Sequence, residues 1–220
     1  MRAFGRFPKV MLHFKAFITD LFYENTYVVW DGGDAVVIDP GIPLENLRGF
    51  LEQQKLTPLA VLNTHAHIDH VQSAKALQDE YHLPFYLDPR EKIVLEHLDS
   101  MAAMCGVPMV LKPNVTHLLN DNQELVFGNM HFKVISTPGH SPGGITFLID
   151  LYAFTGDALF KGSIGRTDIP GGDSALLISS IRKRLLPLDP NTIILPGHGD
   201  PSTIGNELKS NPFLKSEAHG

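Results

Sequence analysis

One stretch of the chain, residues 63–70, limits what it can fold into more than any other. It reads N-T-H-A-H-I-D-H, so three histidines and a carboxylate lie within six positions. It directly follows the apolar run Leu59–Leu62, which has the character of a buried strand. A strand that ends in such a dense group of nitrogen and oxygen ligands is hard to explain as ordinary core, because buried polar groups need partners. The stretch therefore predicts that this strand end supplies a binding site.

Further polar residues share this context, at or just past the end of an apolar run and among small residues: His140, Asp157 and His198. Neutral imidazole suits divalent transition metals such as zinc, and a carboxylate can bridge two of them. Loops at strand ends are rigidly based yet free to converge. The whole pattern, H-x-H-x-D-H followed by single H, D and H, therefore predicts a metal site. We expect no metal at the histidines in or beside other predicted elements or in the tail: His13, His82, His97, His117, His131 and His219.

Strand and helix patterns alternate along the chain. The segment Asp31-Gly32-Gly33-Asp34 between two apolar runs is a strong hairpin signal. Each half of the chain has several strands, then a strand that carries ligands, then a helix, which predicts two packed sheets with helices outside. No linker divides the sequence, so we expect a single domain over residues 1–220. The expected helices cover residues 43–54, 71–81, 90–104 and 174–186, and the segment 156–172 reads as a glycine-rich loop.

Composition excludes several classes of protein. A net charge of −6 and a pI near 6.0 argue against a broad nucleic-acid surface. No window approaches the run of about 20 apolar residues that a transmembrane helix needs, and no signal-peptide core is visible. The single cysteine, Cys105, suits a reducing compartment. We therefore expect a cytoplasmic protein with no nucleic-acid or membrane partner, and the sequence leaves its oligomeric state open.

The motif from Thr64 to His70, with His140, Asp157 and His198 at these intervals, resembles the metallo-β-lactamase superfamily. The resemblance covers nearly the entire chain. It implies an α/β (α+β) fold, a four-layer αββα sandwich of two mixed sheets with helices outside, and a two-metal site on one edge.

Within that superfamily the details are similar to the short bacterial type of the glyoxalase II (hydroxyacylglutathione hydrolase) branch. The likeness implies that two groups of residues hold two divalent ions. Zinc is the expected metal, and iron and manganese are the alternatives. Asp157 would bridge the ions, and Asp69 and Asp157 would also be catalytic. The first ion would be held by His65, His67 and His140, and the second by Asp69, His70 and His198.

Such a pair of ions would act on an ester-like carbonyl. Two divalent ions about 3.5–4 Å apart would share a bridging hydroxide as the nucleophile, because a metal lowers the pKa of bound water to roughly 7. The expected function is hydrolysis of a small, anionic thioester. An iron-dependent persulfide dioxygenase, which the segment Gly165–Asp168 also resembles, and another hydrolase such as a lactonase are the alternatives. The aspartate bridge argues against antibiotic hydrolysis, because true β-lactamases of this fold generally lack it.

Two residues outside the ligand set have candidate roles. Asp39, in Asp39-Pro40-Gly41, either ends a strand as a turn residue or accepts a hydrogen bond from the ligand-bearing loop and orients it. Arg166 either binds a substrate carboxylate through two parallel hydrogen bonds or is tied down by Asp168. We expect no C-terminal helical glutathione-binding domain of the kind that longer glyoxalase II enzymes carry, so glutathione specificity is open.

Overall fold

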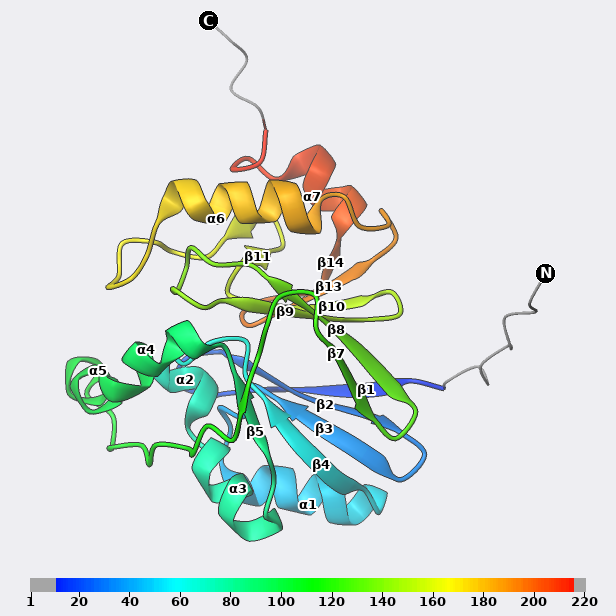
Figure 1. The fold of residues 1–220 in the computed structure, drawn as a ribbon, viewed down its shortest axis with the longest axis vertical. Coiled ribbons are helices and arrows are strands. Elements are labelled where there is room, and N and C mark those ends of the chain that lie inside the picture. Colours follow the sequence, from blue (N-terminus) through cyan, green and yellow to red (C-terminus); the bar gives the residue numbers. More distant parts are fainter. Residues whose placement is uncertain (1–10, 216–220) are drawn as a thin grey trace, which may run out of the picture.

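The computed structural model describes residues 11–215. In this range the chain forms two six-stranded sheets that pack face to face, with helices on their outer faces (Figure 1). This arrangement confirms the expected four-layer αββα sandwich. Over the described range no helix combines the length and the apolar character that a membrane span requires.

The first sheet has the strand order β1-β2-β3-β4-β5-β6. Its first three strands are antiparallel, and the pairs from β3 to β6 are parallel. The predicted hairpin joins β2 to β3, and Gly32 at its turn has a φ of +58°, which a glycine adopts without strain. The strands are β1 (His13–Ile18), β2 (Asn25–Asp31), β3 (Asp34–Ile38), β4 (Thr57–Leu62), β5 (Phe85–Leu87) and β6 (His117–Leu118).

The second sheet has the order β14-β13-β10-β9-β8-β7. Its strands pair antiparallel except for β10 and β13, which are parallel. The carboxyl ends of β10 and β13 therefore lie at the same edge. The strands are β7 (Glu124–Phe127), β8 (Met130–Ser136), β9 (Ile145–Ile149), β10 (Tyr152–Gly156), β13 (Ile193–Pro196) and β14 (Ser202–Thr203).

The central strands β2, β3 and β4 of the first sheet are largely buried on both faces, which explains why β3 and β4 read as nearly continuous apolar runs. Alternate side chains such as Val37 and Val61 belong to one apolar cluster with Leu47 and Leu51 of helix α1 (Leu44–Gln54) and Leu77 of α3 (Ala74–Tyr81). The side chains between them face the other sheet, where they pack on residues such as Phe132, Phe147 and Phe154.

Helices α6 (Ser174–Ser180) and α7 (Ile204–Ser210) cover the outer face of the second sheet (Figure 1). Leu177, Ile181 and Leu185 pack with Ile135 and Ile194 of that sheet. The core therefore has three layers of apolar contact, one between the sheets and one under the helices on either side.

Two expected helices are interrupted, at 71–81 and at 90–104, and the sequence prediction was wrong about their continuity. The helix expected at 71–81 is split into α2 (Ile68–Val71) and α3, because Ser73 donates through its N–H to Pro40 O and through Oγ to Ile42 O. The helix expected at 90–104 consists of a 3₁₀ turn η1 (Pro89–Glu91), α4 (Lys92–Glu96) and α5 (Leu98–Cys105). By contrast, the helix expected at 174–186 is continuous: α6 runs directly into a π-helical turn, Ile181–Leu185.

Two smaller expectations also need correction. Pro43 was expected in the first turn of α1 and instead lies at the position before it. The glycine-rich segment 156–172 contains a small antiparallel pair, β11 (Leu159–Phe160) and β12 (Ser163–Ile164). His219, expected not to bind metal, lies outside the described residues.

Candidate metal centre

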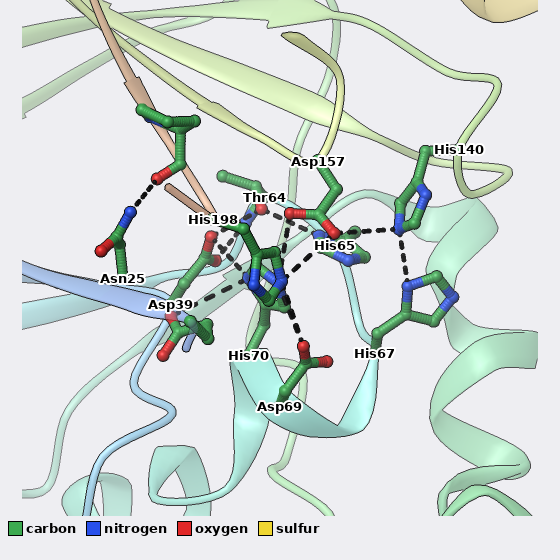
Figure 2. Close-up of polar contacts among 12 residues, drawn as sticks. Asn25, Asp39, Thr64, His65, His67, Asp69, His70, His140, Asp157 and His198 are labelled. Carbon is green, nitrogen blue, oxygen red and sulfur yellow. Dashed lines mark hydrogen bonds and ion pairs between the residues drawn. The ribbon is translucent and has the colours of Figure 1, made fainter. Parts of the chain in front are cut away.

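All of the predicted ligands lie at one edge of the sandwich, where the strands of both sheets end. Two backbone hydrogen bonds join the sheets there, from Ile145 N to Thr64 O at 2.9 Å and from Asn25 N to Gly197 O at 2.7 Å. Figure 2 shows the ligand side chains pointing toward one another. They come from the segment after β4 and from α2, from the β8–β9 loop, and from the residues just after β10 and β13: His65, His67, Asp69, His70, His140, Asp157 and His198.

The first ligand group consists of His65, His67 and His140, one ring nitrogen of each lying within 4.8 Å of the others. His67 Nδ1 lies 2.9 Å from His140 Nε2. The Nε2 atom of His65 is buried and has no hydrogen-bond partner among residues 11–215, which is costly for a polar atom unless something else binds it. Three nitrogens that converge in this way suit a divalent ion.

Polar contacts to the ring nitrogens that face away from the centre orient two rings of this first ligand group. His140 Nδ1 lies 2.8 Å from the carbonyl oxygen of Arg166. A carbonyl only accepts, so this nitrogen carries the proton and Nε2 presents its lone pair to the centre. Thr64 Oγ1 lies 3.0 Å from His65 Nδ1 and holds that ring in the same manner.

The second ligand group consists of Asp69, His70 and His198. Asp69 Oδ2 lies 3.2 Å from His198 Nε2 and 3.8 Å from His70 Nε2. His198 Nδ1 lies 3.2 Å from the carbonyl oxygen of Phe22, which orients its ring as Arg166 O orients His140. This group offers two nitrogens and one oxygen.

Asp157 lies between the two ligand groups. Its Oδ2 is 3.4 Å from His140 Nε2 and 3.5 Å from His198 Nε2, while Oδ1 is 3.4 Å from His70 Nε2. One carboxylate therefore faces nitrogens of both groups, as a bridge between two ions requires. The donor set of imidazole nitrogens and carboxylates fits two ions of the zinc type.

Electrostatics differ between the two ligand groups. Burial, together with the neighbouring histidines, lowers the pKa of His65 well below its usual value and that of His67 to about 3. Both rings are therefore neutral, the form that binds metal. Burial also opposes a charge on His70, but the carboxylates of Asp69, Asp157 and Asp39 outweigh it and raise the pKa of that ring.

The carboxylates of the centre are held in the ionised form. Burial raises the pKa of Asp157, but the nearby His70 outweighs this effect and the net pKa lies well below the usual value. Asp69 follows the same balance, with His70 and then His198 keeping its pKa low. Ionised carboxylates add the negative charge that two divalent ions would need.

Asp39 contacts the ligand-bearing loop directly. Its Oδ1 accepts from Thr64 N and its Oδ2 from Thr64 Oγ1, both at 2.7 Å, and Oδ2 also lies 3.1 Å from His70 Nδ1. Asp39 also ends β3 with a φ of +49°, so the turn and the hydrogen bonds to the loop occur together.

Arg166 has both a backbone and a side-chain contact. Its carbonyl oxygen orients His140, whereas its exposed guanidinium donates to both oxygens of Asp168, at 2.8 and 2.9 Å. In this structure the side chain is therefore paired with its neighbour.

Some residues of the site were not anticipated from the sequence. The Asn63 amide donates to His65 O at 3.2 Å and to His70 O at 2.8 Å, and thereby closes the loop that carries the motif. The Asn25 amide donates to Pro196 O and Gly199 O on either side of His198. A single polar residue at a strand end gives no signal for such a role, because turns use the same residue types.

The αββα sandwich, with an H-x-H-x-D-H motif and three further predicted ligands at its edge, defines the class as a metallohydrolase fold. The chain belongs to the metallo-beta-lactamase superfamily, whose sequence model matches residues 19–198.

Relatives and solved structures agree with this placement. The chain is 41% identical over 207 residues to the protein named hydroxyacylglutathione hydrolase GloC of Haemophilus influenzae, covering 90% of this chain and 95% of that protein. The crystal structure of the BLEG-1 B3 metallo-beta-lactamase has a TM-score of 0.87 at 40% identity and covers 93% of this chain and 100% of its own. The crystal structure of TTHA1623 in a di-iron-bound form has a TM-score of 0.83 at 39% identity and covers 91% of this chain and 100% of its own.

Proposed function

We propose that the protein is a binuclear metal-dependent thioester hydrolase of the hydroxyacylglutathione hydrolase type. The observation that carries the proposal is the place of Asp157, whose carboxylate faces nitrogens of both ligand groups. The 41% identity to the protein named hydroxyacylglutathione hydrolase supports the substrate class. Zinc is the ion we propose, and iron is an alternative that the di-iron form of TTHA1623 supports.

The residues of the centre would have different roles in such a reaction. Divalent ions, when bound, would supply Lewis acidity and lower the pKa of a bound water to about 7. His65, His67 and His140 present ring nitrogens to the centre, and the hydrogen bond to the Arg166 carbonyl keeps Nε2 of His140 aimed inward. Asp157 and Asp69 stay ionised, so their charged oxygens would ligate the ions and could accept a hydrogen bond from a water bound there.

Arg166 is the residue we propose for the anionic part of the substrate. Its backbone is fixed beside His140, while its guanidinium is exposed and bonded to Asp168. Exposed ion pairs contribute little to stability, so a substrate carboxylate can replace Asp168 and make the same two parallel hydrogen bonds.

β-Lactam hydrolysis is a second candidate, because the crystal structure of the BLEG-1 B3 metallo-beta-lactamase is similar over its full length. The two reactions share attack by water on a carbonyl and differ in the leaving group and the substrate shape. The aspartate bridge at Asp157 favours the thioester.

A panel of substrates tests the proposal. The metal-loaded protein should hydrolyse S-lactoylglutathione, measured by loss of thioester absorbance, far faster than the chromogenic cephalosporin nitrocefin. Faster turnover of nitrocefin would replace the thioester by the second candidate. Oxygen consumption on glutathione persulfide without thioester turnover would make the protein a dioxygenase.

A further inference from the structure

Glu91 links the two loops that carry the first ligand group, His65, His67 and His140. Its side chain is completely buried. Oε2 accepts the N–H of Ala66 at 2.9 Å, and Oε1 accepts the N–H of Gly143 at 2.6 Å. Ala66 lies between two of the ligands, and Gly143 lies three residues after the third. One carboxylate therefore joins the end of the first sheet to a loop of the second.

The position of Glu91 is itself fixed by its neighbours. It is the last residue of η1, which begins after Asp88, and Asp88 accepts the N–H of Arg90 at 2.8 Å. The Arg90 guanidinium bonds both oxygens of Asp88 and donates to Ser136 Oγ at 2.9 Å, at the end of the strand that leads to His140. The turn that carries Glu91 is thus bonded to the end of β8, the strand that precedes the loop with His140.

Gly143 is placed so that this contact can form. A side-chain carbon at this position would lie 2.7 Å from Asp88 Oδ1 and 2.9 Å from Glu91 Cγ, closer than packing allows. The absence of a side chain lets the loop approach the carboxylate. The close approach of the loop, the short hydrogen bond to Gly143 and the burial of Glu91 together indicate a specific, well-packed contact.

The second ligand group is held by different residues. His70 and its loop are bonded by Asp39 and Asn63, and His198 by the carbonyl of Phe22. None of these contacts involves Glu91. A change at Glu91 therefore acts on the separation between His140 and the His65–His67 pair.

We propose that Glu91 is a positioning residue for the first ligand group and sets its affinity for metal. Hydrogen bonds from backbone N–H groups to a carboxylate are stronger than neutral ones, so they can hold two loops at a fixed spacing. The inference rests on the proposed binuclear centre. It does not depend on which substrate that centre hydrolyses.

The test uses Glu91→Gln in two backgrounds and measures metal affinity by competition with a chromogenic chelator for Zn²⁺. Glutamine has the same size but only one carbonyl oxygen, and its amide donor must face one of the two N–H groups. In His198→Ala, where the first ligand group is intact, Glu91→Gln should weaken zinc binding by roughly 10–100-fold, as loss of residues that orient ligands typically does. In His67→Ala, where the second group is intact, zinc affinity should change less than twofold.

The matched control is Glu207→Gln. Glu207 is also a buried carboxylate, and it accepts the N–H of Gly162 at 2.8 Å and the hydroxyl of Ser202 at the outer side of the second sheet. It should leave zinc affinity in the His198→Ala background unchanged. Equal weakening by the control, equal weakening in both backgrounds, or no weakening in His198→Ala would each overturn the proposal.

A second variant guards against a protein that does not fold. Glu91→Asp keeps both carboxylate oxygens, but the shorter side chain leaves them one methylene away from their N–H partners. This variant should also weaken zinc binding more in the His198→Ala background than in His67→Ala. If the wild-type protein binds two ions but turns over no thioester, the proposed substrate fails while the affinity comparison still decides the role of Glu91.

Discussion

Asp39 Oδ2 lies 3.1 Å from Nδ1 of His70, so the ring nitrogen that faces away from the metal centre has a carboxylate partner. The same carboxylate bonds the backbone and the hydroxyl of Thr64. Asp39, which directly follows β3, thereby orients His70, a predicted ligand on α2, and the loop before it.

Asp39→Asn separates the turn from the orientation of the ligand. Asparagine tolerates the positive φ of this position, so the turn should persist while one of the two carboxylate acceptors is lost. Loss of such a partner typically lowers metal affinity by roughly 10–100-fold. Chelator competition on Asp39→Asn and Asp39→Ala measures this. Full metal content and unchanged affinity in both variants would leave Asp39 only its role in the turn.

His67→Ala should remove the ion of the first ligand group and abolish hydrolysis, because His67 Nδ1 and His140 Nε2 lie 2.9 Å apart and are proposed to bind the same ion. Elemental analysis should find about one ion fewer per chain. The control is His82→Asn, at the exposed, left-handed end of α3, where asparagine keeps the backbone. Comparable metal loss in the two variants would refute the ligand assignment.

Gly197→Ala should disrupt both ligand groups at once. A side-chain carbon there would collide with Asp157 Oδ1 and would lie 2.6 Å from His70 Cε1. Because Asp157 faces both groups, we expect loss of both ions, measured as metal per chain. Gly49→Ala in α1 is the control: it has open space and should stabilise the helix by about 1 kcal/mol without changing metal content. Two retained ions in Gly197→Ala would show that Asp157 does not bridge from this position.

Arg166→Ala should raise KM for the anionic thioester several-fold and leave kcat nearly unchanged. The guanidinium is proposed to bind a part of the substrate away from the reacting carbonyl, so its loss removes binding that is equal in the ground and transition states. His140 should stay oriented, because its contact is to the Arg166 backbone. Steady-state kinetics of Arg166→Ala and Asp168→Ala check this. A fall in kcat with KM constant would contradict the role.

The convergence of the predicted ligand residues at one edge could be expected from the sequence, because each of these residues carries a strong local signal. The motif at 63–70 follows a buried strand, and His140, Asp157 and His198 follow strands of their own. The packing of two sheets then brings their ends together at one edge. The division of the ligands into two groups came from the family resemblance, and the sequence alone left it open.

Other features depended on contacts that no local pattern reveals. The helix expected at 71–81 is interrupted because Ser73 bonds Pro40 O and Ile42 O across the fold. Glu91 looks like an ordinary acidic residue near the start of a helix, and only the meeting of two distant loops makes it a buried acceptor. Roles of this kind arise from tertiary structure.

The most direct test of the binuclear centre is the metal content of the wild-type protein, measured by elemental analysis on protein purified without chelators. The account predicts about two divalent ions per chain. Zinc is the expected metal, and two iron ions per chain would also agree with the account. One ion per chain after saturation with metal, even at high protein concentration, would contradict a centre bridged by Asp157.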